Sequence, residues 1–205
     1  MEFLHAIIVL SNFVVIPAIA YGSQLALGAL GVTLVYGILR FSNFAHGDTM
    51  AFGTMVAILF TWWFQSIGVS IAPLPTALLA LPIAIVVTAA LLLGTDRVVL
   101  RFYRKQKSAP VILLIVSLGI MFVYNGLVRF IIGVGDQRFS DGARFIISAR
   151  DFKKLTGLDE GLAIKTTQVI TVITAVLVVA ILFWFLNRTR TGKSMRAFSD
   201  NEDLA

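Results

Sequence analysis

The chain contains no cysteine, only two histidines and little charge, since 14% of its residues are Asp, Glu, Lys or Arg. The absence of cysteine excludes disulfides, thiolate nucleophiles and cysteine metal sites. A soluble domain carries about a quarter charged residues, so this chain is too poor in charge to cover the surface of a soluble globule. Hydrophobic residues make up 58% of it instead.

The hydrophobic residues are gathered in four long runs that contain no Asp, Glu, Lys or Arg. These runs are 37, 47, 21 and 22 residues long and cover residues 3–39, 49–95, 108–128 and 166–187. A helix needs roughly 20 apolar residues to cross a bilayer. Backbone groups in lipid must find partners within their own segment, which favours helices. The sequence therefore predicts an all-α, polytopic membrane protein.

The runs predict five crossings. The longest would make a helix of about 70 Å, so it must fold back. The stretch "SIGVSIAPLP" provides the turn through Gly68, Pro73 and Pro75. In the first run we expect a tilted or lipid-surface piece up to Pro17, followed by a crossing. The predicted crossings lie near residues 18–39, 49–66, 74–94, 109–131 and 166–187.

The basic residues predict the orientation, because cytoplasmic loops retain Lys and Arg. The loop "DRVVLRFYRKQK" and the tail "NRTRTGKSMR" are strongly basic, whereas residues 133–165 combine six basic residues with five acidic ones. We therefore expect both basic segments in the cytoplasm, and the mixed loop and the N-terminus outside. We interpret the excess of basic residues, a formal net charge of +6, as a signal of topology. No nucleic-acid partner is expected, because no folded basic surface supports one.

No catalytic motif is complete in the sequence. "TGKS", Thr191 to Ser194, resembles the end of a phosphate-binding P-loop, but Asn187 stands where that loop needs glycine, and a membrane helix precedes it. A basic turn in which Gly192 ends the helix is the better interpretation. Neither G-x-S-x-G nor H-E-x-x-H occurs. We expect no enzymatic site and no metal site.

Small residues recur at spacings of four, three and four along the first predicted crossing, at Gly22, Ala26, Ala29 and Thr33. They form one stripe on a helix, where another helix could approach closely. Glycine and alanine are also common in membrane helices generally. Both interpretations carry similar weight.

The stretch "RFSNFAHGD" interrupts the apolar sequence between the first two predicted crossings. It is too apolar for a free, solvated hairpin, so we expect a packed turn at the membrane face. Asn43 and His46 would then satisfy backbone groups, and Gly47 would allow a tight bend. Asp48 would begin the next helix, where a carboxylate suits the N-terminal partial charge.

At these residues a resemblance appears. "LGALGVTLVYGILRFSNFAHGD" resembles the signature of the permease subunits of branched-chain amino-acid ABC importers, and among them the shorter, H-type subunit. In that family a G-L-T-L-I-Y-G-like helix leads into N-F-A-H-G and an acidic residue. The matching positions are Thr33, Tyr36, Gly37, Asn43, Phe44, Ala45, His46, Gly47 and Asp48.

The tail "TRTGKSMRAFSDNEDLA" resembles the cytoplasmic segment with which the family docks on its ATPase subunits. The matching positions are Thr189, Gly192, Arg196, Ala197, Asp200 and Ala205. Within it we expect a helix from Ser199, with Ser199 as N-cap and Glu202 completing a capping box. Family members continue through further membrane helices, so we expect a truncated chain. Residues 1–187 would form the permease domain and residues 188–205 the start of the docking segment.

The resemblance implies an importer of branched-chain or related amino acids and amides in the bacterial inner membrane. It implies a second permease, two cytoplasmic ATPases that bind the ATP, an external solute-binding protein and surrounding lipid as partners, and no cofactor in this chain. A secondary transporter or channel that uses His46 and Asp48 as a polar relay is the alternative, and a structural scaffold is a third. The basic tail favours the importer.

Overall fold

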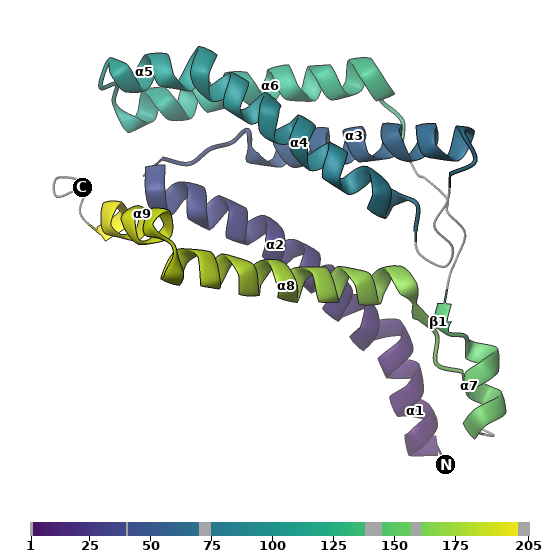
Figure 1. The fold of residues 1–205 in the computed structure, drawn as a ribbon. Helices are drawn as coiled ribbons and strands as arrows, with labels where there is room; N and C mark the ends of the chain where they lie inside the picture. The colour runs from purple at the N-terminus through teal and green to yellow at the C-terminus, as the bar shows by residue number, and fades with distance from the viewer. Residues whose placement is uncertain (1, 40, 70–74, 138–144, 157–160, 201–205) are drawn as a thin grey trace. The chain divides into compact units, whose positions relative to one another are not determined.

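The computed structural model describes residues 2–39, 41–69, 75–137, 145–156 and 161–200 (Figure 1). Two compact units divide the chain. The first joins Met1–Leu30 to Gly142–Ala205, and the second is Gly31–Asp141. Long helices dominate both units, so the prediction of an all-α membrane fold is confirmed.

The N-terminal part is one helical run, composed of α1 (Glu2–Leu10), a π-helical turn η1 (Ser11–Val15) and α2 (Ile16–Leu39). The helix continues through Pro17, so the piece expected up to this residue and the crossing expected after it lie in one candidate span of residues 5–38. Pro17 lies in the first turn of α2, directly after the π-turn, where the Ile16 N–H donates to the Ser11 carbonyl. This wider turn leaves room for the proline ring.

The other elements of the first unit are β1 (Phe145–Ile147), α7 (Ala149–Thr156), β2 (Ile164–Lys165), α8 (Thr166–Arg188) and α9 (Arg190–Asp200). The two strands are antiparallel and lie within the loop that the sequence left without regular structure. Asn12 of the π-turn holds this region in place. Its Oδ1 accepts the Ala163 N–H at 3.2 Å, and its Nδ2 donates to the Gly161 carbonyl at 3.5 Å.

The second unit consists of α3 (His46–Ser66), α4 (Ala77–Thr95), a π-turn η2 (Asp96–Leu100), α5 (Arg101–Lys105) and α6 (Pro110–Ile132). α3 packs between α4 and α6, and α4 runs back along it (Figure 1). Its core contains Phe52, Met55 and Val56 of α3 with Ala84 of α4. Gly53 brings the two helices together, because a Cβ there would lie 3.1 Å from the Thr88 hydroxyl oxygen.

The turn after α3 contains Gly68, one of the residues that the sequence predicted for this turn. Gly68 has φ +76°, the left-handed conformation that ends many helices. The Val69 N–H donates to the Phe64 carbonyl at 3.0 Å across it. Pro75 precedes α4 and accepts the Leu78 N–H through its carbonyl. Pro73 lies outside the described residues.

Four helical spans in the described residues are long and apolar enough to cross a membrane: His5–Ile38, Ala77–Lys105, Pro110–Ile132 and Thr166–Arg188. The predicted count of five is wrong by this measure, because α3 is not among them. α3 contains His46, Asp48 and Gln65 besides several threonines, which lowers its hydropathy. Its neighbours bury six of its side chains, so its stability does not require an apolar surface all round.

Candidate functional site

The signature turn, residues 43–48, is built on a local hydrogen-bond network. The Asn43 Oδ1 accepts the Ala45 N–H at 3.1 Å, and the Asn43 carbonyl accepts the His46 N–H at 3.3 Å. The Phe44 N–H donates to the hydroxyl of Ser117, a fully buried residue of α6, at 3.2 Å. Backbone groups that a turn would leave unpaired thus find partners here.

Ala45 attaches the signature turn to the helices behind it. It is 3% exposed and forms one buried cluster with Ile120 and Tyr124 of α6. Partly buried hydrophobic residues of α4, η2 and α6 pack against this cluster: Leu91, Val99, Leu100, Val116 and Met121. The Tyr124 hydroxyl also hydrogen-bonds the Thr95 hydroxyl at the end of α4. The turn is therefore a packed junction and not a solvated hairpin.

Asp48 links the start of α3 to α6. Its Oδ1 accepts a hydrogen bond from the Asn125 Nδ2 at 2.9 Å, and both side chains are partly buried. The helix begins at His46, so Asp48 lies in its first turn, where its charge complements the helix dipole. The sequence reasoning did not single out Asn125, although it is the one residue with an amide side chain in α6.

His46 lies directly against Gly31 of α2. A Cβ built on Gly31 would come within 2.6 Å of both the Cε1 and the Nε2 of the His46 ring. Gly31 therefore permits the close approach of α2 to the start of α3 within the second unit. Gly31 was not singled out by the sequence reasoning, and the glycines in "LGALGV" are the only signal that could have indicated it.

The tight bend expected at Gly47 is wrong. Gly47 lies inside α3, does not have a positive φ, and has no atom within 4 Å of a Cβ placed on it. The change of direction occurs earlier, at Ser42–Ala45, where Asn43 supplies the turn through its side chain. A side-chain hydrogen bond has replaced the backbone freedom that the glycine was expected to provide.

The small-residue stripe of Gly22, Ala26, Ala29 and Thr33 is exposed along α2. A Cβ on Gly22 would meet nothing within 4 Å. The first three residues belong to the first unit and Thr33 to the second. Packing of another helix on this stripe stays a prediction.

Thr189 forms a hydrogen-bonded elbow between α8 and α9. Its backbone is extended, with φ −85° and ψ 152°. Its hydroxyl oxygen accepts the Gly192 N–H at 3.0 Å and donates to the Phe185 carbonyl at 2.7 Å. Thr189 thus serves as N-cap of α9 while it satisfies a carbonyl at the end of α8.

Gly192 is buried inside this elbow. A Cβ at this position would contact the Phe185 carbonyl oxygen and would lie 2.6 Å from the Cα of Leu186. Both atoms are backbone atoms of α8 and cannot turn away. The position therefore accepts only glycine while α9 keeps this path.

Two predictions about the tail are wrong. Gly192 does not end the preceding helix, because α8 ends at Arg188 and Gly192 lies in the first turn of α9. Ser199 does not start a helix, since α9 runs from Arg190 to Asp200. The cap at Thr189 starts the helix ten residues earlier than the capping-box pattern indicated.

The remaining tail residues have the following places. The Arg196 Nη1 donates to the Asn187 Oδ1 at 2.9 Å, and Ala197 is exposed. Asp200 is the last residue of α9. Glu202 and Ala205 lie outside the described residues.

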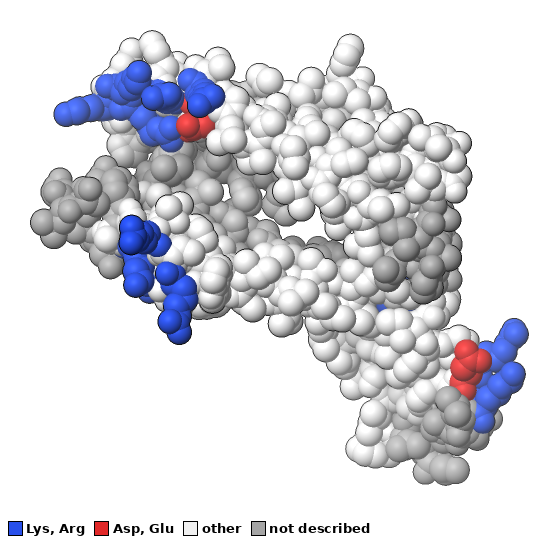
Figure 2. Space-filling model, viewed as in Figure 1, with Lys and Arg blue, Asp and Glu red and all other residues white. Residues whose placement is uncertain are grey.

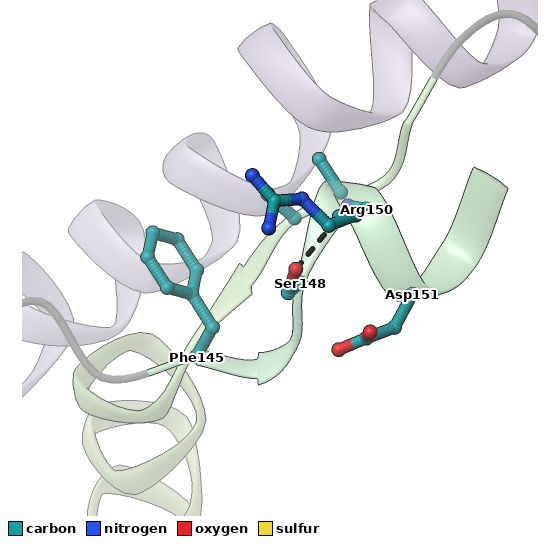
Figure 3. A pocket seen from close by; sticks show the side chains of 6 residues that line it. Phe145, Ser148, Arg150 and Asp151 are labelled. Atoms are coloured by element: carbon teal, nitrogen blue, oxygen red, sulfur yellow. Dashed lines mark hydrogen bonds between the residues drawn. The ribbon is translucent and has the colours of Figure 1, made fainter. Parts of the chain in front are cut away.

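A surface cavity of about 520 Å³ lies at the start of α7, in the loop between α6 and α8. Figure 3 shows the Arg150 side chain extending toward the ring of Phe145. The Arg150 N–H donates to the Ser148 hydroxyl at 3.2 Å, which caps the helix. Ala149 and Ala163 complete the lining. None of the predicted site residues contributes to this cavity.

Comparison with known proteins places this chain among membrane transport permeases. Residues 14–205 match the family described as branched-chain amino acid transport system / permease component. The permease protein BraD of Pseudomonas aeruginosa is 28% identical over 187 residues, and LivH of Salmonella typhimurium is 27% identical over 190 residues. Both alignments cover 91% of this chain and 58% of the relative.

An archaeal relative, the probable branched-chain amino acid transport permease protein LivH of Methanocaldococcus jannaschii, is 28% identical over 194 residues. That alignment covers 92% of this chain and 55% of the relative, so the chain spans little more than half the length of these proteins. No solved structure matches. The family match extends over the signature turn and the α8–α9 elbow, and the chain belongs to the branched-chain amino acid transport permease family.

Proposed function

We propose that this chain is a permease subunit of an ATP-driven importer of branched-chain amino acids. It would supply part of the membrane pathway, while separate subunits bind and hydrolyse ATP. The names of the relatives, which are high-affinity branched-chain amino acid transport permeases, support the solute class. The family match includes both blocks that carry the resemblance, the signature turn and the tail.

The α8–α9 elbow is the observation that carries this proposal. A subunit driven from outside must transmit force between its docking segment and its membrane helices. Two features fix the path of α9 as it leaves the span α8: the Thr189 cap and the close packing of Gly192 on the backbone of α8. α9 would then move together with α8 when an ATPase subunit engages it, which couples hydrolysis to the pathway.

The proposed assembly contains a second permease subunit, two cytoplasmic ATPases and an external solute-binding protein. The chain is a multi-pass membrane protein, and we place it in the bacterial inner membrane. The exposed small-residue stripe on α2 offers a face for the second permease. Exposed cations on α9, Arg190, Lys193 and Arg196, offer polar contacts to an ATPase.

Uptake by the assembled importer in proteoliposomes tests the proposal. Labelled leucine should enter only when the binding protein and ATP are both present. Gly192→Ala should retain ATP hydrolysis but lose most of the uptake, because the elbow cannot close around a Cβ. Gly94→Ala is the matched control, since a Cβ there meets nothing within 4 Å. Uptake driven by a proton gradient without ATP would support the secondary transporter instead.

A further inference from the structure

The helix made of α4, η2 and α5 is longer than a bilayer requires. It runs for 29 residues from Ala77 to Lys105, or about 43 Å at 1.5 Å per residue. The hydrocarbon core is about 30 Å thick. If the span begins at Ala77, roughly the last nine residues extend into the headgroup region. These residues are η2 and α5.

One face of the segment η2–α5 packs against the other helices of the second unit. Thr95 bonds Tyr124, and Val99 and Leu100 pack against the cluster formed by Ala45, Ile120 and Tyr124. The basic side chains therefore lie on the outward face, and Figure 2 shows them gathered at this end of the helix.

Cations and large apolar side chains are interleaved on that outward face, which we call the η2–α5 face. Val98 is 78% exposed and Phe102 is 56% exposed. In the described part of the chain, the only ion pair joins Arg104 to Asp96 at 2.6 Å. The other cations of the face have no acidic partner in the described residues: Arg97, Arg101 and Lys105.

We propose that the η2–α5 face binds the headgroups of anionic phospholipids. Apart from the edge-on contact between the Phe102 and Tyr103 rings, water would leave the exposed surfaces of Val98 and Phe102 without apolar contacts. The boundary between headgroups and acyl chains, by contrast, receives apolar and cationic side chains together. Basic residues next to a membrane span attract anionic lipid, and guanidinium groups hydrogen-bond phosphate oxygens. The charge of the face is complementary to such a surface, and its position at the end of a span places it there.

Lipid binding by the purified 205-residue chain tests the proposal. Native mass spectrometry from mixed micelles measures the apparent Kd for phosphatidylglycerol and for phosphatidylcholine. The wild type should prefer phosphatidylglycerol. R97Q/R101Q/K105Q should weaken this binding by about a hundredfold, because each of the three cations contributes about fivefold. Salt at 0.5 M should weaken the wild type in the same direction.

A second triple variant, R150Q/K153Q/K154Q, controls for net charge. It removes three exposed cations from α7, and its affinity should stay within about twofold of the wild type. Equal losses in both triples would overturn the proposal, as would a wild type without preference for phosphatidylglycerol. Competition by soluble glycerol phosphate at equal concentration would also overturn it, since the face would then bind a free anion. Because the charged tips are exposed, all variants should retain the wild-type elution volume.

Discussion

At the residue scale, the contact between Gly31 and His46 gives a sharp prediction. Gly31→Ala places a methyl group within 2.6 Å of the His46 ring, so the ring or α2 must shift. Overpacking of this kind costs about 1–3 kcal/mol. Thermal unfolding in detergent should show a lower Tm. Gly47→Ala is the control, because open space surrounds that Cβ and alanine favours the helix.

The double variant Gly31→Ala with His46→Ala separates this clash from any other effect of the methyl group. Removal of the ring should restore most of the Tm that Gly31→Ala loses, which gives a favourable coupling energy in a double-mutant cycle. Strict additivity of the two changes would show that the methyl group does not meet the ring.

The Asp48–Asn125 bond supports a second prediction at this scale. Asn125→Leu leaves the partly buried Asp48 carboxylate without the amide that donates to it at 2.9 Å. A lost partner for such a group costs about 1–3 kcal/mol. Asn125→Asp should be at least as harmful through repulsion, whereas Gly126→Ala changes an exposed neighbour and should be neutral. Equal Tm values in all three variants would contradict the role of this bond.

His46→Gln tests the relay alternative from the same turn. An amide can form a hydrogen bond but cannot carry a proton as imidazole does. In the assembled importer we expect His46→Gln to retain partial ATP-dependent uptake. Complete loss of uptake with normal amounts of protein in the membrane would favour the relay.

At this scale the sequence indicated the right stretch but not the right mechanism. Asn43, His46 and Asp48 were visible because polar residues are costly among apolar runs. Asn43 does bond the backbone of its own turn. The partners Gly31, Ser117 and Asn125 were not visible, because they lie on other helices and only packing brings them near. The bend predicted at Gly47 was wrong because a glycine next to a turn can equally well be a helix residue.

At the scale of elements, the elbow predicts how α9 is held. Thr189→Val keeps the shape of the side chain but removes the hydroxyl that caps α9 and bonds the Phe185 carbonyl. Loss of an N-cap costs about 1 kcal/mol, so the first turn of α9 should fray. Hydrogen–deuterium exchange should speed up about fivefold at the amides of α9.

Two variants test whether this effect belongs to the cap. Thr189→Ser keeps the hydroxyl and should retain the protection of α9. Thr174→Val makes the same chemical change at an exposed position of α8 and should leave α9 unaffected. Unchanged exchange in Thr189→Val would mean that the Gly192 contact alone holds the elbow.

Helix positions were predictable from the sequence to within a few residues wherever uncharged runs stop. Predicted crossings at 109–131 and 166–187 correspond to α6 at Pro110–Ile132 and α8 at Thr166–Arg188. The π-turn before Pro17 was not predictable, because it depends on hydrogen bonds five residues apart that leave no pattern in hydropathy. The sequence reasoning considered a cap only at Ser199, where a capping-box pattern occurs, and did not recognise Thr189 as the N-cap of α9.

At the scale of the whole molecule, the four apolar spans predict which segments share a side of the membrane. Two of them, α6 and α8, separate the basic η2–α5 segment, the loop with α7, and the tail. The first and last of these segments must therefore lie on the same side, and α7 must lie on the other. This result does not depend on α3, so the lower span count leaves the relative placement unchanged. Retained basic residues favour the cytoplasm for η2–α5 and α9.

The absence of cysteine from the chain makes this placement directly measurable. Single substitutions Val98→Cys, Lys153→Cys and Ser194→Cys introduce thiols at exposed positions. An impermeant thiol reagent should label Lys153→Cys in whole cells, and the other two only after permeabilisation. Labelling of Val98→Cys together with Lys153→Cys in intact cells would mean that α6 does not cross, and the orientation would have to be abandoned.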